Sequence, residues 1–355
     1  MPISKKSGAS SAARCRLLAP GWNERTRLAL SNLISEGANQ RLPVVFDFDN
    51  TLVCGDIGEA TLAVLARTGV LTPDSVPPHL CPRFRAGQNV VKMENCADVT
   101  EYYEALLSPT VHGTRDTQPL ANGYAWATQV MEGLPLTEVV NATRAAYEWS
   151  DPEHPGVIEV TPGRTAYPVP FFYPEMVELL VQLLEHRFDV WIISASNAWS
   201  VRWMVIHALN PRLLECGAPS PLRADHVVGI SMLLEDRNDR LYKDSVLVQE
   251  SAAYARLETA AVKKFTLTGQ LHYPVPTYSG KIAVIYDVLG RTPYLVAGDS
   301  PGDLPMLSTG RHRLWIKRLN KPAYQKTAAG WFRRADRNHW IIQSVDARPG
   351  GGFVA

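Results

Sequence analysis

Residues 44–53 read VVFDFDNTLV, and the rest of the chain is organised around this stretch. An apolar run rich in β-branched residues ends abruptly in Asp47 and Asp49, and Asn50 and Thr51 follow. This pattern predicts a buried strand that ends in a polar turn, which is where parallel α/β sheets place their ligand sites. Two carboxylates this close repel each other, so we expect a cation between them. Mg²⁺ is the natural candidate, because it prefers carboxylates together with water and phosphate oxygens.

The composition of the chain describes an ordinary soluble globular protein. Its 355 residues are 46% hydrophobic and 20% charged, with a net charge of +1. Such a balance argues against nucleic acid or an anionic membrane surface as the partner and favours a small molecule. No stretch is long and apolar enough for a membrane span, and residues 1–20 lack the apolar core of a signal peptide. With five scattered cysteines that show no paired spacing, we expect a cytoplasmic protein with reduced thiols.

The first part of the chain predicts helices on either side of the opening strand. Apolar periodicity indicates helices over 22–38 and 56–68, with the strand over 42–48 between them. From residue 72 the periodicity weakens and prolines become frequent, and helices are indicated at 99–107, 124–131 and 136–149. No strand in this region is convincing. The sequence therefore predicts a mainly helical insertion that returns through a stiff, proline-rich linker.

An alternation of strands and helices then resumes. Strands are indicated at 188–193, 226–233 and 293–297. Helices are indicated at 176–186, 199–209, 280–289 and 304–307. This alternation predicts an α/β fold with a doubly wound, Rossmann-like parallel sheet. We expect a tail and helix at 1–40, a catalytic core at 41–56 and 172–355, and a helical cap inserted after the first strand at 57–171.

Two later strands also end in polar residues. The strand ending at residue 193 is followed by Ser194 and Ser196, and the strand ending at residue 297 is followed by Asp299 and Asp303. Lys281 opens the helix that precedes the latter strand. Since the carboxyl ends of parallel strands share one edge of the sheet, we expect these groups to meet there.

This set of residues suits the hydrolysis of phosphate esters. The reaction needs a nucleophile, positive charge on the phosphoryl oxygens and a proton donor for the leaving group. The carboxylate of Asp47 can attack phosphorus and form an aspartyl-phosphate. Asp49 can protonate the departing oxygen and later deprotonate the attacking water, and we expect Thr51 to orient Asp49 or the nearby backbone.

The remaining polar residues would bind the phosphate and the metal. We expect Ser194 to donate its hydroxyl to the phosphoryl oxygens, with Ser196 as the competing candidate, and Lys281 to supply a positive charge. Asp299 is predicted to bind Mg²⁺ directly. Asp303 would act through water or through Lys281, and a helix cap is the alternative role for Asp303.

The order and local sequence of these residues resemble the four motifs of the haloacid dehalogenase superfamily of phosphotransferases. The resemblance runs from about residue 42 to residue 307, and the family's roles agree with those given above. It implies a metal site made of Asp47, Asp49, Asp299 and Asp303, in which Asp49 meets Mg²⁺ through its backbone carbonyl. The predicted insertion resembles the helical cap of the phosphoserine phosphatase-like branch, which would select the leaving group and exclude water.

A closer resemblance is to bacterial phosphorylcholine phosphatases. It rests on residues 49–51 (DNT), 56–60 (DIGEA) and 124–133 (YAWATQVMEG) and on the helix led by Trp22. A quaternary ammonium group needs carboxylates for its charge and aromatic faces for its methyl groups. The candidate substrate-binding residues are Asp56, Glu59, Asn50, Tyr124 and Trp126, together with Tyr102 and Tyr103. For the aromatic residues, ordinary packing inside the cap is the alternative.

The sequence therefore predicts a Mg²⁺-dependent phosphomonoesterase for a small aminated phosphate ester such as phosphocholine. One alternative is a phosphoserine phosphatase, in which Arg83 or Arg85 would bind the carboxylate of the substrate. Others are a phosphotransferase that uses the same intermediate and a non-catalytic protein that keeps the fold. A dehalogenase would need neither Asp49 nor a metal. The oligomeric state and the roles of the N-terminal tail and of residues 331–355 stay open.

Overall fold

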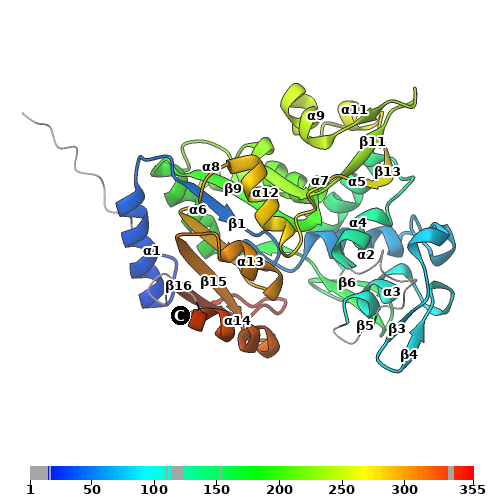
Figure 1. Cartoon of the computed structure of the whole chain (residues 1–355), viewed down its shortest axis with the longest axis horizontal. Helices are drawn as coiled ribbons and strands as arrows, with labels where there is room; N and C mark the ends of the chain where they lie inside the picture. The colour runs from blue at the N-terminus through cyan, green and yellow to red at the C-terminus, as the bar shows by residue number, and fades with distance from the viewer. Residues whose placement is uncertain (1–14, 16, 109–110, 113–122, 152, 335–339) are drawn as a thin grey trace, which may run out of the picture.

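A sheet of seven strands forms the centre of the computed structural model (Figure 1). The structure describes residues 15, 17–108, 111–112, 123–151, 153–334 and 340–355. The strand order is β10-β9-β1-β14-β15-β16-β17, and all neighbours are parallel except β16 and β17. The strands are β1 (Pro43–Phe46), β9 (Asp189–Asn197), β10 (Val227–Ile230), β14 (Leu295–Gly298), β15 (His312–Arg318), β16 (Trp340–Val345) and β17 (Phe353–Val354).

Helices cover both faces of this sheet, because its central strands β1 and β14 are buried at every position, on both sides. Val44 and Phe46 belong to a core cluster that includes Leu30 of α1 and Leu179 of α6, whereas Val45 packs in a second cluster with residues of α12, α13 and α14. The helices of the core are α1 (Glu24–Gly37), α6 (Pro174–Glu185), α7 (Ala198–Trp203), the π-helical turn Met204–Leu209, α8 (Asn210–Glu215), α12 (Gly280–Leu289), α13 (Leu304–Leu307) and α14 (Pro322–Arg334). The predicted doubly wound α/β fold is confirmed.

A first insert follows β1 and returns before α6. Its base is a short antiparallel pair, β2 (Val53–Cys54) with β8 (Phe171–Phe172). The insert contains α2 (Ile57–Arg67), α3 (Val99–Leu106), α4 (Gly123–Gln129) and α5 (Leu136–Tyr147), and single 3₁₀ turns at Pro73–Ser75, Pro78–Leu80 and Met93–Asn95. These helices begin and end close to the predicted positions. The division into a core and a cap at 57–171 stays a prediction.

The expectation that this insert contains no strands is wrong. It holds β3 (Phe84–Ala86), β4 (Asn89–Val91) and β5 (Val111–His112), and a hairpin of β6 (Val157–Thr161) and β7 (Thr165–Pro168). The hairpin replaces the expected extended linker. The strands are short and irregular, and prolines flank them, so the period-two pattern that marks a strand is too brief to be seen in the sequence.

A second insert, which the sequence did not predict, lies between β10 and α12. It contains a small antiparallel sheet in the order β12-β11-β13. Its elements are β11 (Met232–Glu235), β12 (Leu241–Tyr242), α9 (Asp244–Glu250), α10 (Ala252–Ala255), α11 (Thr259–Val262) and β13 (Thr266–Leu271). The predicted single strand at 226–233 is thus two strands in different sheets, β10 and β11.

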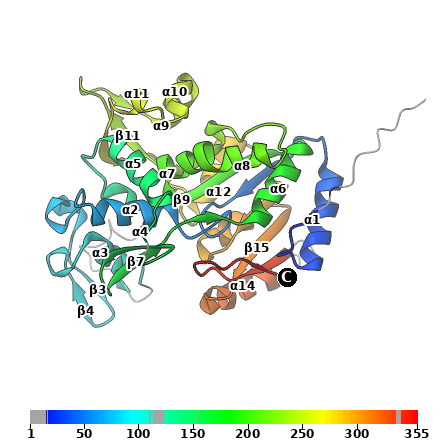
Figure 2. The ribbon, with the colours of Figure 1, turned by 180° about the vertical axis from the view of Figure 1, so that it is seen from behind.

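Backbone hydrogen bonds join the two inserts, which lie side by side in both views of the molecule (Figures 1 and 2). The N–H of Gly133 donates to the carbonyl of Leu267 at 2.9 Å, and the N–H of Leu267 donates to Leu134 at 3.0 Å. The N–H of Leu136 donates to Phe265 at 2.9 Å. Residues 133–136 therefore cover the free edge of β13.

In the described ranges, no helix combines the length and the apolar character that crossing a bilayer requires.

Candidate active site

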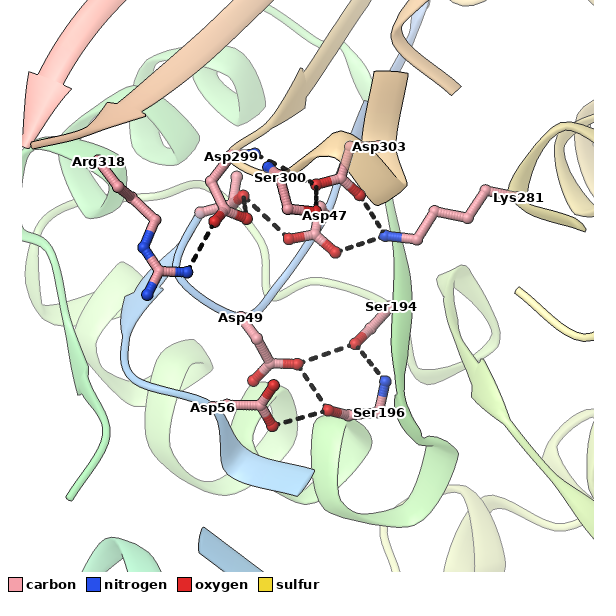
Figure 3. A network of polar contacts seen from close by, with 11 residues as sticks. Asp47, Asp49, Asp56, Ser194, Ser196, Lys281, Asp299, Ser300, Asp303 and Arg318 are labelled. Carbon is pink, nitrogen blue, oxygen red and sulfur yellow. Dashed lines mark hydrogen bonds and ion pairs between the residues drawn. The ribbon is translucent and has the colours of Figure 1, made fainter. Parts of the chain in front are cut away.

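Polar side chains from four neighbouring strands meet at the carboxyl edge of the sheet. They line a cleft with about 500 Å³ of empty space, and the acidic and basic groups in its wall are Asp47, Asp49, Asp56, Lys281, Asp299, Asp303 and Arg318. Parallel alignment causes this meeting: Phe46 of β1 pairs with Ala297 of β14, so the residues that follow both strands emerge together. Figure 3 shows this network.

Asp47 lies in the centre of the network and is buried. Its Oδ1 accepts a hydrogen bond from Nζ of Lys281 at 2.6 Å, and its Oδ2 accepts one from the hydroxyl of Thr51 at 2.9 Å. Burial and the charge of Asp303 raise the pKa of Asp47 to about 8, although Lys281 opposes this. The expectation that Thr51 orients Asp49 or the nearby backbone is wrong. The turn after β1 directs its hydroxyl to Asp47, and to Oδ1 of Asp299 at 3.4 Å.

Lys281, in the first turn of α12, bridges the carboxylates of Asp47 and Asp303. Its Nζ is 2.6 Å from Oδ1 of Asp47 and 2.6 Å from Oδ1 of Asp303. Burial alone would lower the pKa of Lys281, but the two carboxylates raise it overall. The other oxygen of Asp303 accepts hydrogen bonds from the backbone N–H groups of Asp299 and Ser300. Asp303 therefore combines the two roles considered for it, contact with Lys281 and capping of the turn that starts at Ser300.

Asp299 is held by a residue that the sequence did not suggest. Nη1 of Arg318, at the carboxyl end of β15, donates to Oδ2 of Asp299 at 3.0 Å. Burial raises the pKa of Asp299 to about 6, and the charge of Arg318 limits this rise. The apolar run Leu314–Ile316 followed by two basic residues could have indicated β15 and its charged end, because it repeats the pattern of a strand that ends in polar residues.

Asp49 faces the opposite wall of the cleft from Lys281. Its Oδ1 accepts a hydrogen bond from the N–H of Ile57 at 2.7 Å, and its Oδ2 accepts bonds from the hydroxyls of Ser194 at 3.0 Å and Ser196 at 2.7 Å. Both serines reach Asp49 because β9 continues to Asn197, beyond its predicted end, so residues two apart share a face. Burial, and then the charges of Asp56 and Asp47, raise the pKa of Asp49 well above its ordinary value.

The donor set fits a hard divalent cation. Oxygens of Asp47, Asp299 and Asp303 lie within 4.8 Å of one another, and all three residues are buried. Asp303 already uses both oxygens, whereas Oδ2 of Asp47 and Oδ1 of Asp299 face the same hydroxyl of Thr51, which can donate only one proton. Three buried carboxylates repel one another, and Lys281 contacts only two of them, so a hard divalent cation such as Mg²⁺ would stabilise the group. The carboxylate of Asp49 lies outside this group. The expected contact between Mg²⁺ and the backbone carbonyl of Asp49 stays a prediction.

A smaller cavity, with room for about one water molecule, adjoins the cleft under the first insert. Asp56, Glu59, Tyr103 and Tyr124 contribute to its wall, and Asp56 and Tyr124 line both cavities. Asp56 caps α2 by accepting from the N–H of Glu59 at 2.9 Å. The hydroxyl of Tyr103 donates to Oε1 of Glu59 at 3.2 Å. Two carboxylates and two aromatic rings therefore face one small space beside the larger cleft.

The other predicted substrate-binding residues divide into two groups. Asn50 lines the larger cleft and has a φ of 57°, a left-handed conformation that asparagine tolerates better than most residues. Trp126 lines neither cavity: its ring stacks on Tyr103, and its N–H donates to the carbonyl of Leu80. Tyr102 is likewise packed inside the insert.

The cleft also contains two aromatic residues that no pattern in the sequence indicated. Tyr278 precedes α12 and lies 6.2 Å from Tyr124 between ring centroids, and Tyr324 is on α14. The two come from segments far from the first insert in sequence, and neither follows a predicted strand. Only the fold brings them to Tyr124.

Comparisons with known proteins support the fold. No protein-family model matches the sequence, and no curated protein matches it. A conserved, functionally unknown protein from Anaerococcus prevotii has a similar structure, with 19% sequence identity, a TM-score of 0.63 and coverage of 94% of this chain and 95% of that chain. At this identity the similarity shows a shared fold and nothing about activity.

Two further structures match less well. A substrate-bound phosphoserine phosphatase is 12% identical, with a TM-score of 0.34 over 81% of this chain and 90% of that chain. A HAD family hydrolase from Salmonella enterica serovar Typhi is 12% identical, with a TM-score of 0.39 over 87% and 77%. No conclusion about this chain rests on either of these two. The class that the fold defines is a mixed α/β protein with a mostly parallel, Rossmann-like central sheet.

Proposed function

We propose that this protein is a Mg²⁺-dependent phosphomonoesterase that forms an aspartyl-phosphate on Asp47 and acts on a small aminated phosphate ester such as phosphocholine. The observation that carries the proposal is the arrangement around Asp47. Its carboxylate lies between Lys281 and Thr51 and belongs to a cluster suited to a divalent cation, and Asp49 lines the same cleft. A nucleophile, positive charge and a separate acid are what the reaction requires.

Two displacements at phosphorus complete the reaction. The carboxylate of Asp47 attacks phosphorus, and the bond to the leaving oxygen breaks while Asp49 gives that oxygen its proton. A water molecule then attacks the phosphorus of the aspartyl-phosphate and passes a proton back to Asp49, which frees inorganic phosphate and restores Asp47. The raised pKa of Asp49 supports this role, because a general acid must carry a proton when the substrate binds.

Asp47 and Asp299 would hold Mg²⁺, with Asp303 next to them. When bound, the ion would neutralise negative charge on the phosphoryl oxygens and orient them for attack. Lys281 keeps Asp47 and Asp303 in place and contributes positive charge of its own.

The smaller cavity suits a cationic leaving group. Asp56, and Glu59 when it is ionised, supply negative charge, and Tyr103 and Tyr124 supply aromatic faces. The alternative that the substrate is phosphoserine would need a cation for a carboxylate. The residues considered for that task, Arg83 and Arg85, are exposed and line neither cavity, so we rank phosphoserine lower. A phosphotransferase would use the same intermediate and differ only in the acceptor.

The test is a panel of phosphomonoesters assayed with Mg²⁺ and with a chelator. We expect phosphocholine to be hydrolysed faster than phosphoserine, and activity to be lost with the chelator. Replacing the nucleophile in Asp47→Asn should lower kcat by about a thousandfold or more. After an acid quench, the native enzyme should yield a phosphorylated peptide containing residue 47, and Asp47→Asn should not.

A matched control is Asp225→Asn, which changes a carboxylate paired with Arg223 outside the cleft. It should keep native activity. Full activity of Asp47→Asn with Mg²⁺ would refute the assignment of the nucleophile. Faster hydrolysis of phosphoserine would reverse the ranking of substrates, and a phosphorylated product from an added alcohol would identify a phosphotransferase.

A further inference from the structure

Arg318 is a charged residue of the cleft whose role the proposed reaction does not use. It lies at the carboxyl end of β15, and its side chain is only 13% exposed. Nη1 donates to Oδ2 of Asp299 at 3.0 Å (Figure 3). The guanidinium carbon lies 6.0 Å from the ring centroid of Tyr324. Its Nε is buried and has no hydrogen-bond partner among the described residues.

The cleft needs a cation besides Lys281 if it is to bind a phosphate. The ammonium group of Lys281 is shared by Asp47 and Asp303, at 2.6 Å from each, so its charge is already balanced. With three ionised carboxylates and Lys281 alone, a divalent cation would leave the cluster neutral. Arg318 adds one positive charge to this group, and so offsets one of the two further carboxylates in the cleft wall, Asp49 and Asp56. A phosphate monoester is a dianion near neutral pH, and this positive charge favours its binding.

We propose that Arg318 is the second anion-attracting cation of this cleft, held against Asp299 so that it adds a positive charge beside the metal-binding cluster where a phosphate group would enter. The proposal rests on the proposed function, because it assumes that a phosphate enters the cleft. Asp299 and Tyr324 fix the guanidinium in advance, which lowers the cost of ordering it when the phosphate binds.

The competing interpretation is that Arg318 serves only to position Asp299 as a metal ligand. The two roles predict opposite changes in metal binding. An anchor for a ligand carboxylate should strengthen metal binding, so its loss would weaken it. A positive charge beside the metal repels it, so the loss of an anion-attracting cation should leave Mg²⁺ affinity unchanged or increase it, while phosphate affinity falls.

The experiment measures both affinities by calorimetry on the full chain. Mg²⁺ is titrated into the metal-free protein, and inorganic phosphate is titrated into protein saturated with Mg²⁺. For Arg318→Gln we expect phosphate affinity to fall by about tenfold or more, because a charge-assisted contact is lost. Mg²⁺ affinity should stay the same or rise. Arg318→Lys keeps the charge and should retain most of the phosphate affinity.

The control is Lys317→Gln, which removes a positive charge from the adjacent position of the same strand. Side chains alternate along a strand, so Lys317 points away from Arg318, and it does not line the cleft. Phosphate affinity should change by less than about twofold in this variant. If Arg318→Gln does not fold, Arg318→Met is measured in its place, because methionine keeps the apolar part of the side chain and removes the charge.

Each outcome decides between the proposals. Native phosphate affinity in Arg318→Gln would overturn the role of Arg318 and leave the proposed function intact. Weaker Mg²⁺ binding in that variant would make Arg318 a positioning residue for Asp299 instead. If the native protein with Mg²⁺ bound no phosphate at all, the proposed function would fail, and the role of Arg318 with it.

Discussion

Glu59 is an acidic residue in the wall of the smaller cavity, and it changes its charge within the pH range in which enzyme activity can be measured. Burial, and then the charge of Asp56, raise the pKa of Glu59 to about 8, despite the hydrogen bond from Tyr103. Below that pH the side chain is mostly neutral, and above it the side chain is a carboxylate. Only the carboxylate attracts a cation strongly, so the attraction of this cavity for a cationic head group should grow with pH.

We therefore expect the KM for phosphocholine to fall as the pH rises from about 7 to about 9, by up to about tenfold. Steady-state kinetics across this range would measure it. The comparison substrate is 3,3-dimethylbutyl phosphate, which has the shape of phosphocholine without its positive charge and should show no such fall. The ratio of the two KM values cancels pH effects on the catalytic groups.

Glu59→Gln tests whether ionisation of Glu59 causes the pH dependence of the KM for phosphocholine. The amide keeps the size of the side chain but cannot ionise, so the KM ratio should become flat with pH and the KM for phosphocholine should stay high. A ratio that still changes near pH 8 in Glu59→Gln would assign the effect to another group, of which Asp56 is the nearest.

Single residues were predictable from the sequence where they directly follow an apolar strand. Asp47, Asp49 and Asp299 do so and line one cleft, and Ser194, which also ends an apolar run, donates a hydrogen bond to Asp49. Arg318 follows a strand that was not recognised. Tyr278 and Tyr324 follow no strand, and the packing of distant segments alone brings them to the site. Trp126 fails as a cavity residue because its aromatic neighbours bury it, which a sequence does not reveal.

Among the elements, the link between the two inserts has the clearest consequence for motion. Gly133, Leu134 and Leu136 of the first insert exchange hydrogen bonds with Phe265 and Leu267 at the edge of β13. If the first insert moved away from the second insert, all of these hydrogen bonds would have to break. The inserts are therefore expected to move together.

Hydrogen exchange can test this coupling. The amides of Gly133, Leu136 and Leu267 should exchange slowly, because opening requires the separation of two packed inserts. Mass spectrometry of peptides that cover residues 130–137 and 264–270 would measure the rates. The matched control is the hairpin of β3 and β4, where Asn89 and Val90 are exposed and should exchange quickly. Equal rates in the two regions would show that the inserts separate freely.

The elements of the core were more predictable than those of the inserts. Long helices and fully apolar strands repeat their pattern often enough to be recognised, and α12, for example, was predicted at its observed bounds. The strands of both inserts have two to six residues, too few to show a period, and some of them, such as β2 with β8 and β11 with β13, pair with distant segments. The extension of β9 depends on its pairing with Ile230 of β10, which lies far away in the sequence.

At the scale of the whole molecule, the two ends of the described chain pack against each other. Gln343 of β16 is completely buried, and its Oε1 accepts hydrogen bonds from the backbone and side chain of Asn23. Its Nε2 donates to the carbonyls of Gly21 and Val354. Trp22 and Phe353 pack edge to face with centroids 5.1 Å apart. The segment from residue 340 to 355, whose role the sequence left open, thus holds the lead-in of α1 against the sheet.

Gln343→Ala should lower the free energy of unfolding by about 2–4 kcal/mol, because several buried polar groups lose their partner at once. Urea unfolding followed by intrinsic fluorescence would measure it. The control is Gln40→Ala, an exposed glutamine with one hydrogen bond to Glu36, which should change stability by less than about 0.5 kcal/mol. A loss below about 1 kcal/mol in Gln343→Ala would contradict this account of how the ends are joined.

The covered edge of β13 also limits how such proteins can be recombined. A chimera that received only the first insert of a relative would lose the partner of β13 if the new insert lacked a segment matching residues 133–136. The strand would then present unpaired N–H and C=O groups to solvent, a surface that promotes aggregation. Selectivity for a leaving group would thus be exchangeable between relatives only when both inserts are transferred as a pair.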